Sequence, residues 1–248
     1  MLDSWLDLVH GAGCVGCAAP GRSLCRTCAA RLPGAGRPVR PTPCPDGLAA
    51  CFAAGDYDDL LRAMVLAHKE HGVFSLADPL GRALAAVALP VLDPGSVNVL
   101  VPVPSRPAVV RERGHDPVLR FVRAAARRLQ GRGPVVCVTQ VLEQRAPVHD
   151  QAGLSSGQRA ANLVGSMGVR QAAREALARR GAAVSLLVCD DVLTTGATAR
   201  EAQRALEGSG LPVRAVVTVT ATRRRLPVAG RPMSLSYLPA LPFSPRAD

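Results

Sequence analysis

The chain is almost without lysine and contains few aromatic residues. Lys69 is the single lysine among 30 basic residues, and phenylalanine, tryptophan and tyrosine make up only 3% of the 248 residues. So few aromatic rings argue against a nucleic-acid surface built on base stacking. In a chain so rich in alanine, glycine and proline, the excess of arginine fits either coding bias or selection for a surface that binds phosphate groups in a bidentate manner.

Long apolar runs are lacking as well. The longest, Ala83 to Leu92, is short and is broken by Pro90, so it does not fit a segment that spans a bilayer. The first ten residues carry Asp3 and Asp7 without a basic start, which does not fit a secretory signal. We therefore expect a cytoplasmic protein without membrane insertion, in which thiols stay reduced.

Composition favours a folded domain with anionic partners. Hydrophobic residues make up 48% and charged residues 20%, which excludes wholesale disorder. The formal net charge of +11 favours partners such as phosphates or nucleic acid. The length fits one large domain, or one domain with a small appendage.

Cysteines are concentrated near the N-terminus, where two CxxC pairs occur. Cys14 and Cys17 form the first pair, Cys25 and Cys28 form the second, and seven residues separate the two pairs. Each pair can direct two thiolates at one ion, and four thiolates complete a tetrahedral zinc site. We predict a structural Zn²⁺ here, with unrelated reduced cysteines as the alternative. Cys44 either replaces one ligand or is the remnant of a further pair.

The remaining pattern indicates a larger domain behind a linker. We expect a cysteine-rich zinc-binding segment at residues 1–32, a proline-rich extended linker at 33–47, the main domain at 48–226 and an irregular tail at 227–248. Helices are expected at residues 56–70, 75–91, 117–130 and 197–207, and in part of 159–180. Strands are expected at residues 49–54, 97–103, 135–142, 184–189 and 213–221. This alternation predicts an α/β fold with an open parallel sheet flanked by helices.

One segment carries a recognisable chemistry. A buried strand is followed by Asp190 and Asp191, and then by a polar turn that opens a helix: Thr194, Thr195, Gly196, Ala197 and Thr198. Ligands of parallel sheets bind beyond the carboxyl ends of the strands, and a helix N-terminus suits a phosphate dianion. The two acids would repel that phosphate, so we infer that they bind hydroxyl groups of the same ligand, a sugar 5-phosphate. The alternative is an ordinary turn with acidic capping residues.

This segment resembles the signature for phosphoribosyl pyrophosphate (PRPP) of type I phosphoribosyltransferases. More of the chain, from about residue 14 to residue 222, resembles one branch, the ComF family, which is associated with competence and DNA uptake. Its features recur here in order: the cysteine-rich start; Tyr57, Arg62 and Lys69; residues 101–104; residues 111–116; then Gln151, Leu154, Arg159 and Asn162. The chain departs from the family at Asp116, where an asparagine is common, and at Cys44, where a third CxxC pair is common.

The resemblance implies a type I phosphoribosyltransferase-like fold that binds PRPP with Mg²⁺. Asp190 and Asp191 would hold the ribose hydroxyls as catalytic residues, and the turn at 194–198 would bind the 5-phosphate. The pyrophosphate would lie against Ser105, Arg106 and Arg113, with Lys69 reaching the phosphates or the acceptor. A mobile flap would cover the site at residues 144–157. The working residues in and just after it would be Gln151, Arg159 and Asn162. For the arginines a solvated face is the alternative, and for the flap residues and Lys69 a structural role.

Two classes of function stay open. The first is an enzyme that transfers phosphoribosyl from PRPP to an acceptor that the sequence does not name. The second is a module that handles single-stranded DNA in DNA uptake, binds PRPP without turnover, and works with a DNA-uptake helicase or with recombination proteins. A PRPP-sensing regulator would require a DNA-binding fold that the pattern does not indicate.

Overall fold

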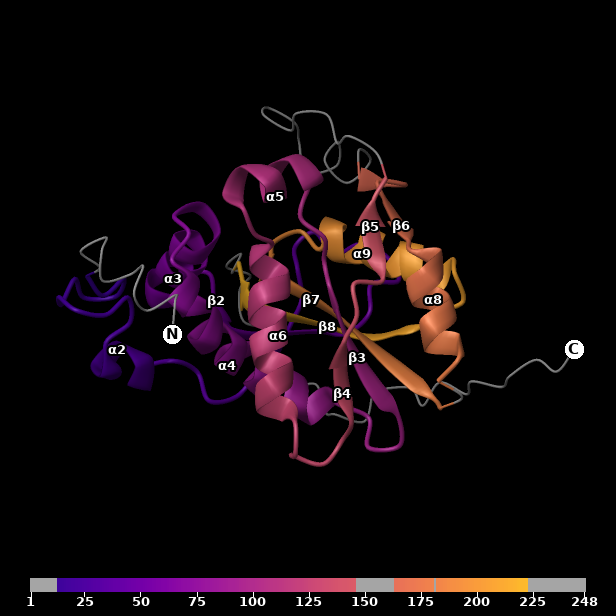
Figure 1. The fold of residues 1–248 in the computed structure, drawn as a ribbon, viewed down its shortest axis with the longest axis horizontal. Helices are drawn as coiled ribbons and strands as arrows, with labels where there is room; N and C mark the ends of the chain where they lie inside the picture. Colours follow the sequence, from indigo (N-terminus) through magenta and orange to yellow (C-terminus); the bar gives the residue numbers. More distant parts are fainter. Residues whose placement is uncertain (1–12, 146–162, 181, 223–248) are drawn as a thin grey trace, which may run out of the picture.

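The structure, a computed structural model, describes residues 13–145, 163–180 and 182–222 (Figure 1). Its centre is a six-stranded sheet in the order β1-β2-β8-β7-β3-β4, in which only the edge strand β1 runs antiparallel to its neighbour. These strands are β1 (Arg37–Val39), β2 (Cys51–Asp56), β3 (Val97–Pro102), β4 (Val136–Val138), β7 (Val184–Leu193) and β8 (Val213–Ala221). The predicted α/β class with a mostly parallel sheet is confirmed.

Helices cover both faces of the sheet. One face carries α3 (Asp59–Glu70), α4 (Ala77–Ala88) and α6 (Pro117–Leu129). The other carries α8 (Gln171–Ala178) and α9 (Ala197–Glu207), together with a small antiparallel ribbon of β5 (Leu142–Gln144) and β6 (Met167–Val169). Two shorter helices, α2 (Arg26–Ala30) and α5 (Pro107–Arg113), lie outside these layers (Figure 1).

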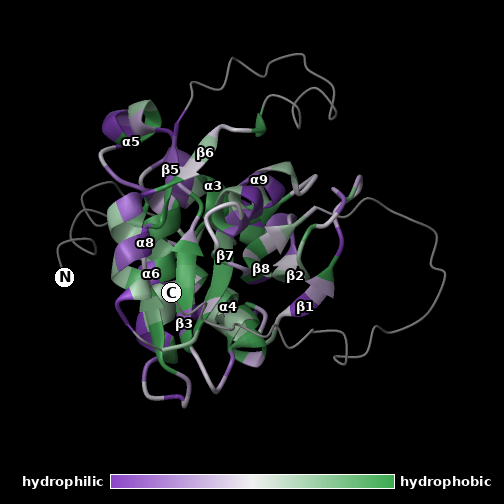
Figure 2. Ribbon diagram, turned by 90° about the vertical axis from the view of Figure 1, so that its right-hand side faces the viewer, coloured by the Kyte–Doolittle hydropathy of each residue, from purple (hydrophilic) through white to green (hydrophobic). Residues whose placement is uncertain are grey.

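The strands are apolar on both sides because each side is covered. In β3, Val99 and Val101 belong to the core under α8 and α9, whereas Leu100 belongs to the core under α3, α4 and α6. Figure 2 shows hydrophobic residues along β3 and β7 and hydrophilic residues on α5. Continuous apolar runs of this kind are typical of central parallel strands.

One apolar helical stretch passes the length and hydropathy criteria for a membrane span among the described residues. It runs from Phe74 to Val91 and joins α4 to two short 3₁₀ turns, Phe74–Leu76 and Leu89–Val91. More than half of it, 56%, is buried inside the protein, where Leu80 and Leu84 pack in the same core as α6. This burial is that of a core helix.

Several boundaries differ from the prediction. The strand expected at residues 135–142 is wrong as one element, because β4 stays in the main sheet while β5 leaves it to pair with β6. The strand expected to end at Cys189 continues to Leu193, since β8 pairs with it as far as that residue. Within the expected linker, β1 pairs with β2. Pro38, which has no N–H to donate, is tolerated there because β1 is an edge strand.

The order of the strands creates a switch point between β3 and β7. After β3 the chain crosses through α6 to β4 on one side, and after β7 it crosses through α9 to β8 on the other. In open α/β sheets, ligands bind at the carboxyl edge where the connections diverge in this way. The loops that follow β3 and β7 therefore define the candidate site.

Candidate functional site

The acid pair lies at the end of β7, on this carboxyl edge. Because successive side chains of a strand point to opposite faces, Asp190 and Asp191 leave β7 on different sides. Asp190 lines a small pocket together with Thr194, Thr198 and Thr218. Asp191 is 6% exposed and meets Lys69 of α3 on the other side. The two carboxyl groups thus lie on opposite faces of the sheet, one beside the turn at 194–198 and the other beside α3.

The turn after β7 leaves the N-terminus of α9 without a side-chain cap. Gly196 is the N-cap residue, and no described side chain accepts a hydrogen bond from the first turn of this helix. The alternative of acidic capping residues therefore does not apply here. The first N–H groups of a helix have no partner within it, so this end offers donors and a positive dipole end to an anion.

Gly196 is required by two separate constraints. Its φ of +73° lies in the left-handed region, where residues with a Cβ are strained. A Cβ at this position would also lie 2.9 Å from Leu48 Cδ2 and 2.9 Å from Pro41 Cγ. The proline-rich segment therefore packs directly against the turn between β7 and α9.

Among the described residues, Lys69 is the cation that contacts the acid pair. Its Nζ donates a hydrogen bond of 2.7 Å to Asp191 Oδ2. Burial of Lys69 lowers its pKa, but the charge and hydrogen bond of Asp191 and the charge of Asp190 outweigh this effect, so the net pKa is raised. The lysine is therefore positively charged at neutral pH.

Asp190 is the strongly perturbed acid of the site. Burial and the charge of Asp191 raise its pKa to about 8, against the opposing charge of Lys69 and a hydrogen bond of 2.9 Å that the Asp191 N–H donates to Asp190 Oδ1. A carboxyl group perturbed by burial and by a charged neighbour in a crevice is typical of a functional site.

The loop after β3 approaches the same edge and is tied to the start of α6. Val103 N–H donates to the Cys189 carbonyl of β7 at 2.9 Å, which holds the loop beside the acid pair. Asp116 caps α6 by accepting from the Leu119 N–H at 3.1 Å, and it also accepts from Ser105 Oγ at 3.3 Å. Asp116 is therefore a structural cap that positions the Ser105 loop.

The arginines expected to hold pyrophosphate differ in their surroundings. Arg113 at the end of α5 forms an ion pair with Glu70 of α3. Arg106 is exposed, and no ion pair joins it to another described residue. One edge of the sheet is thus lined by Lys69, Ser105, Asp190 and the turn at 194–198. The expected flap residues Gln151, Arg159 and Asn162 lie outside the described residues.

Two threonines of β8 belong to this edge and were missed by sequence reasoning. Thr218 lies opposite Asp190 in the sheet and lines its pocket. Thr220 Oγ1 donates to the Asp191 carbonyl at 3.2 Å. The signal was present, because these two hydroxyls occur at alternate positions in the apolar second half of the strand, after Val216 and Val217.

The four predicted ligand cysteines form one cluster. The sulfur atoms of Cys14, Cys17, Cys25 and Cys28 all lie within 4.8 Å of one another, and Cys44 is not among them. The Cys25 N–H points at Cys14 Sγ at 3.3 Å, and the Cys28 N–H points at Cys25 Sγ at 3.4 Å. These four side chains are positioned to bind one metal ion.

The electrostatics of the cluster fit a cation. Burial and the neighbouring sulfur atoms raise the pKa of Cys28 to about 12. Burial acts in the same direction on Cys14, but backbone N–H groups outweigh it and lower its pKa to about 6. Four thiolates at this spacing repel one another, and a divalent metal removes that repulsion because metal ligands must be deprotonated.

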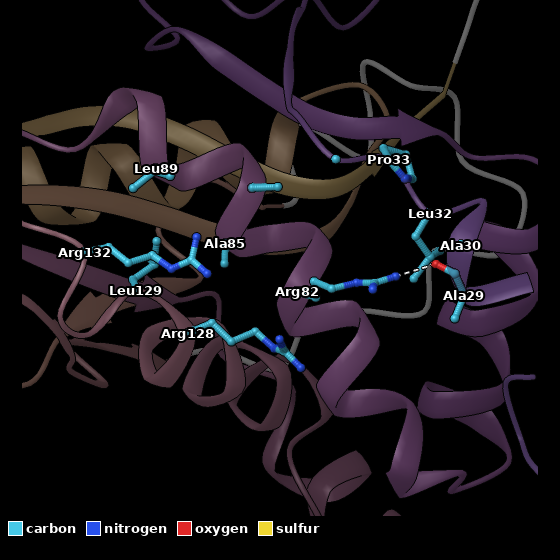
Figure 3. Close-up of a pocket in the computed structure, with 12 residues that line it drawn as sticks. Ala29, Ala30, Leu32, Pro33, Arg82, Ala85, Leu89, Arg128, Leu129 and Arg132 are labelled. Atoms are coloured by element: carbon cyan, nitrogen blue, oxygen red, sulfur yellow. Dashed lines mark hydrogen bonds between the residues drawn. The ribbon is translucent and has the colours of Figure 1, made fainter. Parts of the chain in front are cut away.

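The cluster shares the core of the main domain. Cys14, Cys28 and Leu32 are buried in the same core as α3 and α4. A Cβ on Gly16 would lie 2.6 Å from Leu60 Cδ1 of α3, so the first knuckle packs closely on that helix. Near α2, Arg82 of α4 donates a hydrogen bond to the Ala29 carbonyl (Figure 3). The arrangement of the four cysteines is therefore coupled to the packing of α3 and α4.

No protein-family model matches the chain, and no curated protein matches it.

Proposed function

We propose that this chain is a ComF-like, type I phosphoribosyltransferase-like protein that binds PRPP with Mg²⁺ and transfers phosphoribosyl to an acceptor. The observation that carries the proposal is the arrangement at the β3–β7 switch point. There Asp190 and Asp191 end a central parallel strand and are followed at once by an uncapped helix N-terminus. Hydroxyl-binding and phosphate-binding groups so close together fit a sugar 5-phosphate.

Each part of PRPP has a counterpart at this edge. The N-terminus of α9 offers N–H donors and threonine hydroxyls to the 5-phosphate. The two acids offer acceptors to the ribose hydroxyls. Ser105, Arg106 and Lys69 offer donors to the pyrophosphate, and arginine is well matched to phosphate oxygens.

The chemistry follows from the charges that develop. The bond between the anomeric carbon and the pyrophosphate oxygen breaks, its electron pair leaves with pyrophosphate, and the acceptor forms the new bond to that carbon. Carboxylates beside the ring stabilise the oxocarbenium-like charge, because preorganised charges act strongly in a site with little water. The carboxylates of Asp190 and Asp191 are the oxygen ligands that would hold Mg²⁺ near the ligand, and the ion would supply positive charge that favours departure of pyrophosphate.

Calorimetry with PRPP and Mg²⁺ tests binding, and pyrophosphate release with a panel of nucleobases tests turnover. Replacing Asp190 or Asp191 by Asn removes a charged acceptor, which is worth about 1.5–3 kcal/mol, or about ten- to hundredfold in affinity. Glu175→Gln, on the exposed helix α8, is the control and should bind as the wild type does. Absence of PRPP binding by the wild type would reject the proposal. Binding without pyrophosphate release would limit the function to a PRPP-binding module.

We also propose that the metal at the four cysteines is structural zinc. All four ligands are thiolates, which leaves no open position for a substrate and is typical of structural sites. The described part of the segment around them, residues 13–32, contributes Cys14, Cys28 and Leu32 to the core and holds one short helix, α2. Metal binding would thus supply part of its folding free energy.

An arginine-lined groove supports the second candidate function, handling of single-stranded DNA. Arg82 of α4, Arg128 of α6 and Arg132 surround a cavity of about 380 Å³ between these helices and α2, as Figure 3 shows. A second hollow continues from it past Arg22, and a third lies along α6 beside Arg123. These hollows together follow one side of α6.

The charges along this side of the molecule are unbalanced. Asp78 lines the second and third hollows beside these arginines and pairs with Arg128 at 2.5 Å, and Asp116, the cap of α6, also lines the third. Within the described part of the chain, no ion pair joins Arg123, Arg127 or Arg132 to an acid. Exposed arginines in such a row fit a phosphate backbone, whose binding depends on charge rather than on base identity.

A further inference from the structure

The end of α3 ties three elements to one another through three consecutive residues. The ring nitrogens of His68 lie 3.2 Å from the carbonyl oxygens of Val73 and Pro117, so this buried side chain fixes α3 against the start of α6. Glu70 pairs with Arg113 at the end of α5. Lys69, between them, reaches β7.

This tie fixes the backbone of Lys69, whose ammonium group is held by a hydrogen bond to Asp191. The side chain of Lys69 is 36% exposed, whereas that of Asp191 is 9% exposed. The ammonium group thus sits at the open side of a mostly buried carboxylate. It donates to Asp191 Oδ2, one of the carboxylate oxygens that the proposed function offers to the ribose hydroxyls, so a hydroxyl that approaches from the open side meets the ammonium group first.

Resting on the proposed function, we propose that Lys69 is an exchangeable counter-ion of the acid pair. In the free protein its ammonium group neutralises Asp191. When the pentose phosphate enters, a ribose hydroxyl takes over Asp191 Oδ2, and the ammonium group swings to a pyrophosphate oxygen. The ribose hydroxyl then solvates the Asp191 carboxylate, and the pyrophosphate neutralises the Lys69 ammonium group. No covalent bond changes in this step, and the proton stays on the lysine.

The chemistry of the residue suits this exchange. The ammonium group is a compact charge on a flexible stem, and its single contact with Asp191 can be traded for a single contact with phosphate. A guanidinium group would bind the carboxylate through two parallel hydrogen bonds and leave it less readily. The remaining 29 basic residues of the chain are arginines, yet a lysine stands here.

The single lysine makes the exchange directly observable. In protein labelled at the lysine Nζ and Cε atoms, all lysine signals in a nuclear magnetic resonance spectrum come from Lys69. We expect this signal to shift on titration with PRPP and Mg²⁺, and to shift also with pyrophosphate and Mg²⁺. Ribose 5-phosphate alone should release the ammonium group from Asp191 without giving it a new partner, so it should move the signal in a different direction.

Two variants separate the effect of the positive charge at position 69 from the effect of the shape of the cationic group. Lys69→Arg keeps the charge, but the guanidinium group would hold Asp191 through one hydrogen bond more than the ammonium group does. PRPP has to break this additional bond to a charged group, so its affinity should fall by about tenfold. Lys69→Met should weaken it by at least as much, because it loses the contact with pyrophosphate. Arg179→Met, which removes a cation at the end of α8, is the matched control and should bind normally. Thermal unfolding of each variant checks that it is folded.

The outcomes distinguish this inference from the proposed function. If the wild type binds PRPP while the Lys69 signal does not move and Lys69→Arg binds equally well, the exchange is wrong and the proposed function stands. If the wild type does not bind PRPP, both fall. If the signal moves with PRPP and Lys69→Arg binds about tenfold more weakly, the exchange is supported.

Discussion

At the scale of single residues, the site combines two acids that differ in burial and in ion pairing. Asp191 is buried and paired with Lys69, whereas Asp190 beside it is half-buried and has a pKa raised to about 8. The raised pKa favours the protonated form of Asp190 in the ligand-free protein. Only a ligand that approaches with donors or positive charge makes its ionised form favourable.

We predict that this acid destabilises the free protein as the pH rises. Between the ordinary value of 3.8 and about 8, the folded state holds a proton on Asp190 that the unfolded state has lost. The free energy of unfolding then falls with increasing pH by up to about 1.4 kcal/mol per pH unit from this group. Urea unfolding from pH 5 to pH 8 measures the slope, and Asp190→Asn should reduce it.

Asp93 provides a control, because its pKa is shifted in the opposite direction to that of Asp190. The Gly95 N–H and Ser96 hydroxyl lower the pKa of this residue, so its contribution to stability is present above pH 3.8 and is lost at lower pH. Asp93→Asn should leave the slope between pH 5 and pH 8 unchanged. Equal slopes for the wild type and Asp190→Asn would show that Asp190 titrates normally.

At the scale of secondary-structure elements, the turn between β7 and α9 depends on contacts with the proline-rich segment. This segment is attached to α9 by side-chain hydrogen bonds. Gln203 donates to the Gly47 carbonyl at 2.9 Å and accepts from the Ala49 N–H at 2.8 Å, and Arg200 donates to the Asp46 carbonyl at 3.0 Å. The segment thus forms one wall of the phosphate turn.

We predict that Gly196→Ala is more destabilising than Gly210→Ala. Both glycines have positive φ, at +73° and +76°, so both substitutions carry a backbone strain of about 1–2 kcal/mol. Only the Cβ at position 196 meets neighbours, Leu48 and Pro41, because nothing lies within 4 Å of a Cβ at position 210. Chemical unfolding of the two variants isolates the packing contribution. Equal losses would mean that the wall is not packed as described.

The cysteine cluster should bind zinc and stabilise the whole domain. Cys28→Ser should abolish stoichiometric zinc binding and lower the melting temperature of the whole domain, because Cys28 is buried in the core shared with α3 and α4. Cys137→Ser, at a half-buried position outside the cluster, is the control and should retain one zinc per chain. Metal analysis together with calorimetric melting measures both effects. A cluster variant with full zinc content would contradict the assignment.

At the scale of the whole molecule, the arginine groove predicts a salt-dependent affinity for single-stranded DNA. Binding should weaken steeply between about 50 and 200 mM salt, with little preference for sequence, since phosphate contacts release counterions and do not read bases. Replacing Arg82, Arg123 and Arg132 together by Gln should lower both the affinity and its salt slope.

Replacing Arg174, Arg179 and Arg180 of the α8 region by Gln removes the same charge from the opposite layer and serves as the control. Fluorescence anisotropy at several salt concentrations compares the two triple variants. Equal losses in both variants would mean that the charge acts diffusely rather than along the groove.

How much of the molecule could be predicted from its sequence depended on the range of the interactions. The helices at 59–70, 117–129 and 197–207 and the four-cysteine cluster follow from local spacing, and they occur within a few residues of the predicted positions. The pairing of β5 with β6 and the addition of β1 at the sheet edge depend on partners distant in sequence. The link between Lys69 and Asp191 spans 122 residues, and no local pattern encodes it.

The strand order also sets the sequence of events during synthesis. In the sheet β2 lies between β1 and β8, and its register joins Cys51 to Val216. A nascent chain that has emerged only to about residue 210 contains β2, β3 and β4 but lacks the strand that bridges the two halves. Because domains fold as units once their long-range pairs can form, the sheet must close after β8 leaves the ribosome. Until then the edge of β2 that β8 will cover has no partner strand, and such an edge can pair with another chain.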